Sequence, residues 1–125
     1  MYDFTSLRVW QAAQELYLLV HPWQHHPYFI RNRFMKDQLF RAVLSIQLNL
    51  AEGAGRGRNK EFAFYIRIAR GSLDEVRSLV LLLERLEPGI FETEKILSEL
   101  ATIRKSINSL HSKVQSSNSK DFKTS

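Results

Sequence analysis

The sequence predicts an all-α protein, folded as an antiparallel up-and-down bundle of four helices. Apolar residues recur at steps of three and four positions in four separate segments, and no segment shows the apolar–polar alternation of a strand. The chain has 125 residues, 44% of them hydrophobic, which fits one domain with a core of its own. We expect the bundle to span residues 1–116 and a disordered polar tail to occupy residues 117–125.

The first helix is predicted from about residue 9, where the apolar positions begin. Thr5 or Ser6 is placed to cap its start, and Pro22 ends it. The segment that follows, "HPWQHHPYF", is rich in aromatic residues and long for a connection, so we expect it to pack on the bundle. The apolar positions of this helix are Val9, Ala13, Leu16 and Val20.

The second helix is predicted from about Arg33 to Glu52 and is apolar on two faces. A helix of a small four-helix domain should keep one face in water, so the second face predicts a contact between subunits. The sequence therefore predicts a homo-oligomer. The first stripe contains Leu39, Ala42, Ile46, Asn49 and Gly53; the second contains Phe40, Leu44, Leu48 and Ala51, of which Phe40, Leu44 and Leu48 are the predicted interface.

The third and fourth helices carry heptad-like apolar seams. The third is predicted to begin after Asn59 as N-cap, with Glu61 in its first turn, and to end before Pro88. Gly71 inside it costs about 1 kcal/mol relative to alanine, which predicts a close backbone approach at that position. The seams are Phe62, Ile66, Ala69, Leu73, Val76, Val80 and Leu83, then Ile96, Leu100, Ile103, Ile107, Leu110 and Val114.

The net charge of +5 is concentrated in residues 31–60. This quarter of the chain holds seven basic residues and two acidic ones: Arg31, Arg33, Lys36, Arg41, Arg56, Arg58 and Lys60 against Asp37 and Glu52. Such a cluster favours an acidic partner such as RNA or DNA, and a merely solubilising surface is the alternative.

The stretch "NLAEGAGRGRNKEF" lies between the second and third predicted helices. A P-loop requires a preceding strand and a Lys-Ser/Thr pair, and both are missing, so a helix end and a tight turn explain Gly53, Gly55 and Gly57. The turn also carries Arg56, Arg58 and Lys60 beside the start of a helix, whose free N–H groups attract anions. We therefore predict a rim that contacts nucleic-acid phosphates there, with Arg31 and Arg33 as further contacts. The alternative is a helix terminator with a soluble surface.

Other candidate sites are weaker. Three histidines, His21, His25 and His26, are interrupted by prolines and predict no metal site. His111 is interpreted as a surface or core residue. Asn49 and Glu52 are predicted to be structural, since a buried Asn usually fixes helix register. No set of nucleophile, base and orienting residue emerges, so we expect no enzyme activity and no cofactor.

The chain has no cysteine, no signal peptide pattern and no apolar stretch of the roughly 18–20 residues that cross a membrane. These features predict a cytoplasmic protein without a membrane partner.

Three motifs resemble a known family. "FTSLRVWQAAQEL", "QLFRAVLSIQLNLAEGAGR" and "EFAFYIRIARGSLDEV" are similar, in order and spacing, to the small four-helix-bundle proteins encoded within intervening sequences of bacterial large-subunit (23S) ribosomal RNA genes. The family's pattern falls on Ser45, Ile46, Asn49, Ala51, Glu52, Gly53, Gly55 and Arg56, and then on Glu61, Phe62, Ile68, Ala69, Gly71 and Ser72. Gln47 stands where the family has proline, Leu50 where it has isoleucine, and Phe40 where a basic residue is usual.

The resemblance implies a ring-like homo-oligomer, a pentamer in related proteins. It also implies a relation to the accessory proteins of diversity-generating retroelements, which bind a reverse transcriptase and nucleic acid. We therefore expect a non-enzymatic oligomeric protein that contacts RNA or DNA through the basic rim. The alternative is a scaffold that docks a partner protein, for example a reverse transcriptase, with nucleic-acid binding incidental.

Overall fold

The computed structural model describes residues 3–124, and within this range the chain is helical without any β-strand. Four long helices, α1 (Arg8–Val20), α3 (Arg33–Gly55), α4 (Asn59–Leu86) and α5 (Thr93–Thr124), make up most of it. Short 3₁₀ turns (Phe4–Ser6 and His21–His25) flank α1, and a five-residue helix, α2 (Pro27–Arg31), precedes α3. The prediction of an all-α chain is confirmed.

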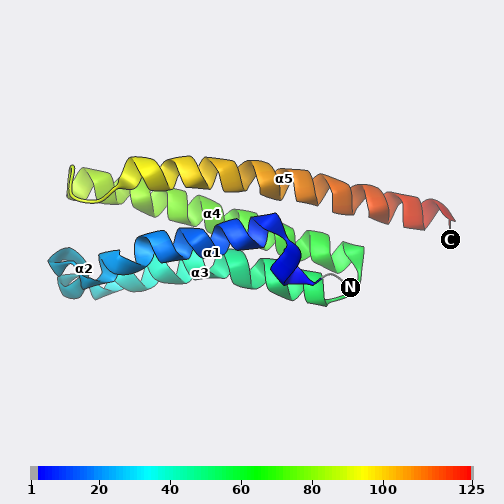
Figure 1. The fold of residues 1–125 in the computed structure, drawn as a ribbon, viewed down its shortest axis with the longest axis horizontal. Helices are drawn as coiled ribbons and strands as arrows, with labels where there is room; N and C mark the ends of the chain where they lie inside the picture. Colours follow the sequence, from blue (N-terminus) through cyan, green and yellow to red (C-terminus); the bar gives the residue numbers. More distant parts are fainter. Residues whose placement is uncertain (1–2, 125) are drawn as a thin grey trace.

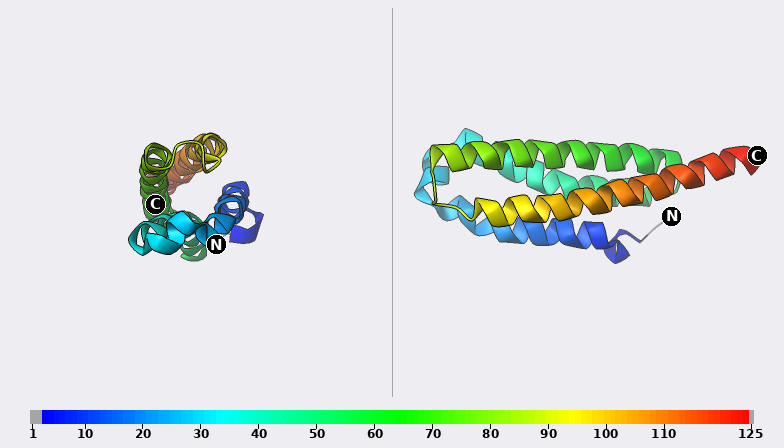
Figure 2. Two further views of the ribbon diagram at one scale, coloured as in Figure 1. Left: turned by 90° about the vertical axis from the view of Figure 1, so that its left-hand side faces the viewer. Right: turned by 90° about the horizontal axis from the view of Figure 1, so that it is seen from above.

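The long helices lie side by side as a helical bundle. Each long helix runs opposite to the one before it, with α2 at one end (Figure 1). Helix α1 packs against α3 and α5, α3 packs against α4, and α4 packs against α5. Seen along the long axis, the four surround a common interior (Figure 2).

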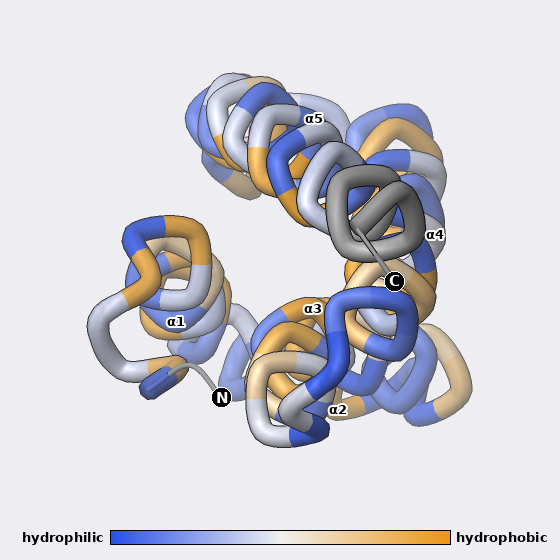
Figure 3. Tube along the Cα trace, turned by 90° about the vertical axis from the view of Figure 1, so that its right-hand side faces the viewer, coloured by the Kyte–Doolittle hydropathy of each residue, from blue (hydrophilic) through white to orange (hydrophobic). Residues whose placement is uncertain are grey.

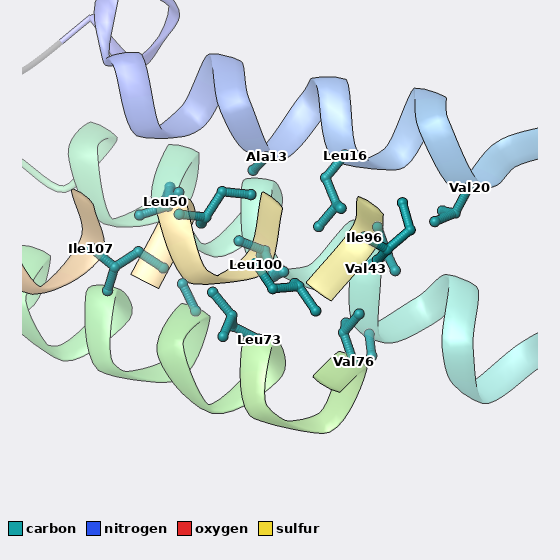
Figure 4. Close-up of a cluster of buried hydrophobic side chains, with 14 of the residues drawn as sticks. Ala13, Leu16, Val20, Val43, Leu50, Leu73, Val76, Ile96, Leu100 and Ile107 are labelled. Carbon is teal, nitrogen blue, oxygen red and sulfur yellow. The ribbon is translucent and has the colours of Figure 1, made fainter. Parts of the chain in front are cut away.

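The core lies between the four long helices and contains most of the residues that the periodicity predicts. On α3 the prediction missed Val43 and Leu50, which are fully buried, and Asn49 of the first predicted stripe is only half-buried. Figure 3 shows hydrophobic positions on the sides of the helices that face one another. In Figure 4, Ala13 and Leu16 of α1 point toward Leu50 of α3 and Leu100 of α5. Every residue of the α4 seam is buried, as are the four predicted residues of α1 and all predicted residues of α5 except the half-buried Leu110.

The connection after α1 is largely helical, although its sequence predicted no helix there. It forms a 3₁₀ turn and then α2, because Phe29 is fully buried and fixes the backbone around it. The Phe29 ring lies 5.8 Å from the ring of Phe40 and 5.3 Å from that of Phe91. Trp23 lies 5.0 Å from the same Phe91 ring, so this segment caps one end of the core, as its aromatic content predicted.

The predicted N-caps of two helices are wrong. Helix α1 begins after Leu7, which gives no side-chain cap, while Thr5 and Ser6 lie in a 3₁₀ turn that Asp3 caps through the Thr5 N–H at 3.1 Å. Asn59 is the first residue of α4, and Arg58 occupies the N-cap position without a side-chain hydrogen bond.

The structure continues α5 to Thr124, over most of the segment 117–125 that the sequence predicts to be a disordered tail. Residue 125 lies outside the described residues. Disorder of this segment stays a prediction.

Candidate nucleic-acid interface

The three glycines between α3 and α4 have three different roles. Gly57 has a φ of +79°, in the left-handed region, and it alone of the three supplies the positive φ that we expected of the turn. Gly53 lies inside α3, where a Cβ would meet the Cβ of Tyr65 at 2.7 Å, so it permits α3 and α4 to approach closely. Gly55 is exposed at the end of α3 with open space around it.

Arg56 is held in place by its neighbours. Its Nη2 donates to Glu52 Oε1 at 2.6 Å and to the Tyr65 hydroxyl at 2.8 Å, and its guanidinium lies 5.1 Å from the centre of the Tyr65 ring. The hydrogen bond to Glu52, followed by the charges of Tyr65 and Glu52, raises the pKa of Arg56. Glu52 thus pairs with this cation, and the contact of Arg56 with Tyr65 ties the end of α3 to α4.

Arg58 and Lys60 are the cations that remain available on this turn. Both are exposed, and neither has an ion-pair partner among the residues that the structure describes. Arg58, the N-cap residue of α4, makes no side-chain hydrogen bond to the N–H groups of the first turn, so within the described residues this helix start has no side-chain cap from its N-cap residue. We define the turn site as Arg58 and Lys60 together with this helix start.

Arg31 and Arg33 do not belong to the same site. Arg31 ends α2 and Arg33 begins α3, so both lie at the opposite end of α3 from the glycine turn. At 1.5 Å per residue, the rise from Arg33 to Arg56 is roughly 35 Å. The charge cluster that is continuous in the sequence is therefore divided between the two ends of one long helix.

A polar network joins α3 to α4 in the middle of their contact. The Asn49 amide donates to the Ser45 carbonyl at 2.8 Å and to the Ser45 hydroxyl at 2.9 Å. The Ser45 and Ser72 hydroxyls are 2.8 Å apart, which fixes the register of the two helices. Gln47, 9% exposed, has no hydrogen-bond partner for its side-chain oxygen within the described part of the chain.

The outer surface of α3 and α4 beside this network is apolar. Leu48 is 54% exposed and Phe64 is 50% exposed, and Ile68 is also exposed. The helices α3 and α4 are antiparallel, and Ser45 lies opposite Ser72. Leu48 is about one turn after Ser45 and Ile68 is about one turn before Ser72, so the two lie at the same level along the helix pair. Gly71 is exposed on α4, and a Cβ added to it would meet nothing within 4 Å. The close approach that we predicted there does not occur within the part of the chain that the structure describes.

Of the other two predicted interface residues, Leu44 is half-buried and Phe40 packs inside the chain. The Phe40 ring lies 6.2 Å from the Tyr17 ring as well as close to Phe29. Leu48 is the member of the predicted set with the most exposed side chain.

A second group of cations, which was not predicted from the sequence, lies along the contact of α4 with α5. Arg67 Nη1 is 3.3 Å from His111 Nε2, Arg70 Nη1 donates to Asn108 Oδ1 at 3.1 Å, and Arg104 pairs with Asp74. Burial, followed by the charges of Arg70 and Arg67, lowers the pKa of His111.

The sequence held a signal for this group. Residues 100–117 contain Arg104, Lys105, His111 and Lys113 and no acidic residue. Over residues 91–125 as a whole this positive charge is partly offset, because Glu92, Glu94 and Glu99 lie just before or at the start of α5.

The described residues contain no group of three or more side chains able to hold a metal ion. His21 lies against the Tyr17 ring at 5.7 Å and against His25 at 6.3 Å, with Gln24 as a hydrogen-bonding neighbour. No helix in the described part of the chain is long and apolar enough to cross a membrane.

Comparison with known proteins identifies one family. The family model described as 23S rRNA-intervening sequence protein matches residues 5–109, a range that includes the glycine turn, the Ser45–Asn49 network and most of the α4–α5 contact. No curated protein matches the chain at a significant level. Since the family model covers most of the sequence, the chain belongs to the family of 23S rRNA-intervening sequence proteins.

Proposed function

We propose that this protein is a non-enzymatic, cytoplasmic, oligomeric binding protein that contacts RNA or DNA phosphates at the turn site. The observation that carries the proposal is that Arg58 and Lys60 are exposed and lack ion-pair partners within the described residues. Lysine and arginine side chains beside uncapped N–H groups at a helix start form a favourable environment for a phosphate.

One turn site is a weak binder by itself. Glu52 neutralises Arg56, and Glu61 lies in the first turn of α4, so the net charge of this region is small. Several copies of the site on one particle would act together on a single nucleic-acid chain, and their effective affinity would exceed that of one site by orders of magnitude. The proposal therefore requires assembly.

We propose further that the fold is an antiparallel up-and-down four-helix bundle that assembles into a ring-like homo-oligomer, a pentamer by family resemblance. The apolar outer surface formed by Leu48, Phe64, Ile68 and Gly71 supports this part of the proposal. An exposed apolar surface on a helix pair favours docking of another helix, and a glycine at its edge allows the backbones to approach closely.

The same apolar surface favours a second candidate function, a scaffold that docks a partner protein. The relation to the accessory proteins of diversity-generating retroelements, which the sequence motifs imply, makes a reverse transcriptase the type of partner to test. In this alternative, nucleic-acid binding is incidental to the protein contact.

Fluorescence anisotropy of a labelled mixed-sequence oligonucleotide, RNA or DNA, over a series of salt concentrations tests the leading proposal. For wild-type protein we expect binding whose affinity falls steeply with salt, with a log–log slope of about −0.7 per phosphate contact for a single strand. The variant R58S/K60S should bind more weakly and with a flatter slope. Arg56 is left in place because it holds the turn together.

The matched control is R85S/K95S, which removes one arginine and one lysine from exposed positions near the other end of the molecule. It should bind as the wild type does. Equal losses in both variants would reduce the effect to net charge and contradict a site at the turn, and absence of any binding at low salt would refute nucleic-acid binding altogether.

A further inference from the structure

The surface where α5 meets α4 carries more uncompensated positive charge than the turn site. Helix α4 contributes Arg67, Arg70 and Arg77, and α5 contributes Arg104 and Lys105. We call these five residues the α4–α5 basic seam. Asp74 pairs with Arg104, and it is the one carboxylate with an ion pair to a seam cation within the described residues.

Two of the seam arginines have neutral partners. Arg70 donates to the Asn108 side-chain oxygen at 3.1 Å, and Arg67 lies 3.3 Å from a nitrogen of the His111 ring. A neutral amide or imidazole fixes the guanidinium in place without cancelling its charge. The remaining N–H donors of both guanidinium groups are therefore available to an anion.

Two cavities flank Lys105, and no carboxylate lines either of them. On the α4 side, a cavity of about 320 Å³ is lined by Arg77, Arg104 and Lys105 over an apolar floor that includes Leu73 and Leu100. On the α1 side, a cavity of about 440 Å³ is lined by Arg8, Lys105 and Lys113, together with Ser6, Ser106 and Ser109. Small hydroxyl side chains beside cations allow a phosphate to approach closely and donate hydrogen bonds to it.

We infer that the α4–α5 basic seam is a second binding surface, separate from the turn site, for the phosphate backbone of a nucleic acid. The choice of a nucleic acid as ligand rests on the proposed function, whereas the position of the surface rests on the seam residues alone. Arg67 and Arg77 are ten residues apart on α4, a rise of about 15 Å, which corresponds to roughly four steps of 3.4 Å along the axis of a duplex. An extended row of guanidinium groups suits the evenly spaced charges of a phosphodiester chain.

The seam lies on a different face of α4 from the apolar surface proposed for assembly. Arg67, Arg70 and Arg77 follow one another at steps of three and seven, on the side that contacts α5. Phe64, Ile68 and Gly71 follow at steps of four and three on the neighbouring side. Arg67 borders the apolar surface, because it is three residues from Phe64 and four from Gly71. Docking through Gly71 therefore leaves accessible the part of the seam that faces α5, with Arg77, Arg104 and Lys105.

His111 gives the seam a signature in pH. The charged groups that face it from α4 are Arg67 and Arg70. Lys113 of α5 lies two positions further along and therefore on another side of the helix, where it lines a cavity together with Arg8 of α1. In the protein without a bound ligand, burial and the two arginines lower the pKa of His111. A phosphate bound to these arginines would cancel their charge and raise the pKa, so binding takes up a proton. Affinity should then increase as the pH falls from about 7.5 to about 5.5, around the ordinary histidine value.

The test compares three variants, each of which loses one arginine and one lysine: R70S/K105S in the seam, R58S/K60S at the turn and R85S/K95S as control. The probe is a labelled mixed-sequence RNA oligonucleotide, and circular dichroism and sedimentation check folding and assembly. We expect R70S/K105S to weaken binding and to flatten the salt slope by about 0.7 per lost contact, while the control leaves both unchanged. H111N should keep binding at neutral pH and lose the increase in affinity at lower pH.

If R70S/K105S is less stable than the wild type, R77S/K105S replaces it, because Arg77 and Lys105 are exposed, line the same cavity and have no ion pair within the described residues. Failure of the wild type to bind RNA at low salt overturns the proposed function and this inference together. If R58S/K60S weakens RNA binding while both seam variants bind as the control does, the proposed function stands and only the inference about the seam is wrong. Polyglutamate is the control for an acidic ligand that is not a nucleic acid. If the wild type binds polyglutamate as tightly as RNA and the seam variant loses this binding, the proposal of a nucleic-acid ligand is wrong and the surface binds an acidic protein instead.

Discussion

Two glycines near the end of α3 differ in their surroundings although they are two residues apart. A Cβ on Gly53 would lie 2.7 Å from the Tyr65 Cβ and 3.0 Å from Phe62 Cδ1, whereas Gly55 has open space. We expect Gly53→Ala to lower the free energy of unfolding by about 1–3 kcal/mol, because α3 and α4 must separate to accommodate the methyl group. Gly55→Ala, the control, should be neutral or raise it by up to about 1 kcal/mol. Urea denaturation measures both values; equal effects would contradict the close approach at Gly53.

Gln47 is a buried polar residue whose side-chain oxygen lacks a partner within the described residues. Leucine has a similar volume and no polar atom, so it removes the cost of burying an oxygen without a hydrogen bond. Gln47→Leu should therefore raise the free energy of unfolding by about 1–2 kcal/mol. The measurement is thermal and chemical denaturation, with Asn49→Ala as the contrast. Asn49 makes two hydrogen bonds to Ser45, and its loss should destabilise the protein by about 1 kcal/mol. A destabilised Gln47→Leu variant would show that the oxygen has a partner in the native particle.

Periodicity predicted the long helices and their core with few errors, while it failed at the ends of helices and in the connection after α1. The α4 seam could be predicted because a long helix that packs on one side must repeat its apolar residues at steps of three and four. Helix starts are decided by local competition instead: Asp3 captures the Thr5 N–H, so Thr5 does not cap α1. The aromatic connection becomes helical because burying Phe29 requires a fixed backbone, which no local pattern records.

Helix α2 gives a direct test of this explanation. The Phe29 side chain is fully buried against Phe40 and Phe91, whereas the adjacent Ile30 is 62% exposed. Phe29→Ala should cost about 3–5 kcal/mol, as for a large buried aromatic side chain, and Ile30→Ala should cost well under 1 kcal/mol. The free energy of unfolding from chemical denaturation measures both. Similar values for the two variants would mean that α2 is not anchored by Phe29.

The position of the candidate sites could be predicted only in part. The turn with Arg56, Arg58 and Lys60 follows from its glycines, and the structure places these residues together. The distance along α3 separates them from Arg31 and Arg33, because a 23-residue helix converts neighbours in sequence into opposite ends of a bundle. The α4–α5 basic seam required the antiparallel pairing of two helices, which brings Arg67 beside His111 across 44 positions of sequence.

A substitution at Gly71 tests whether the protein assembles through the apolar surface. Gly71 lies in the interior of α4, exposed and with open space around it, so nothing within the described chain requires a residue without a side chain. In a free subunit Gly71→Ala should therefore raise the free energy of unfolding by about 0.5–1 kcal/mol through helix propensity. If another copy docks on Leu48, Phe64 and Ile68, the added methyl group instead holds the backbones apart and weakens the particle.

Sedimentation velocity and denaturation of the same samples separate these effects. We expect wild-type protein to sediment as an oligomer at micromolar concentration and Gly71→Ala to shift toward smaller species while its subunits become more resistant to urea. Gly55→Ala adds the same methyl group away from the apolar surface and should leave assembly unchanged. Leu48→Glu should reduce assembly as well, and it is a cleaner probe than a change at the half-buried Leu44 because Leu48 is 54% exposed. A wild-type monomer, or a Gly71→Ala particle of unchanged size, would contradict docking at this surface.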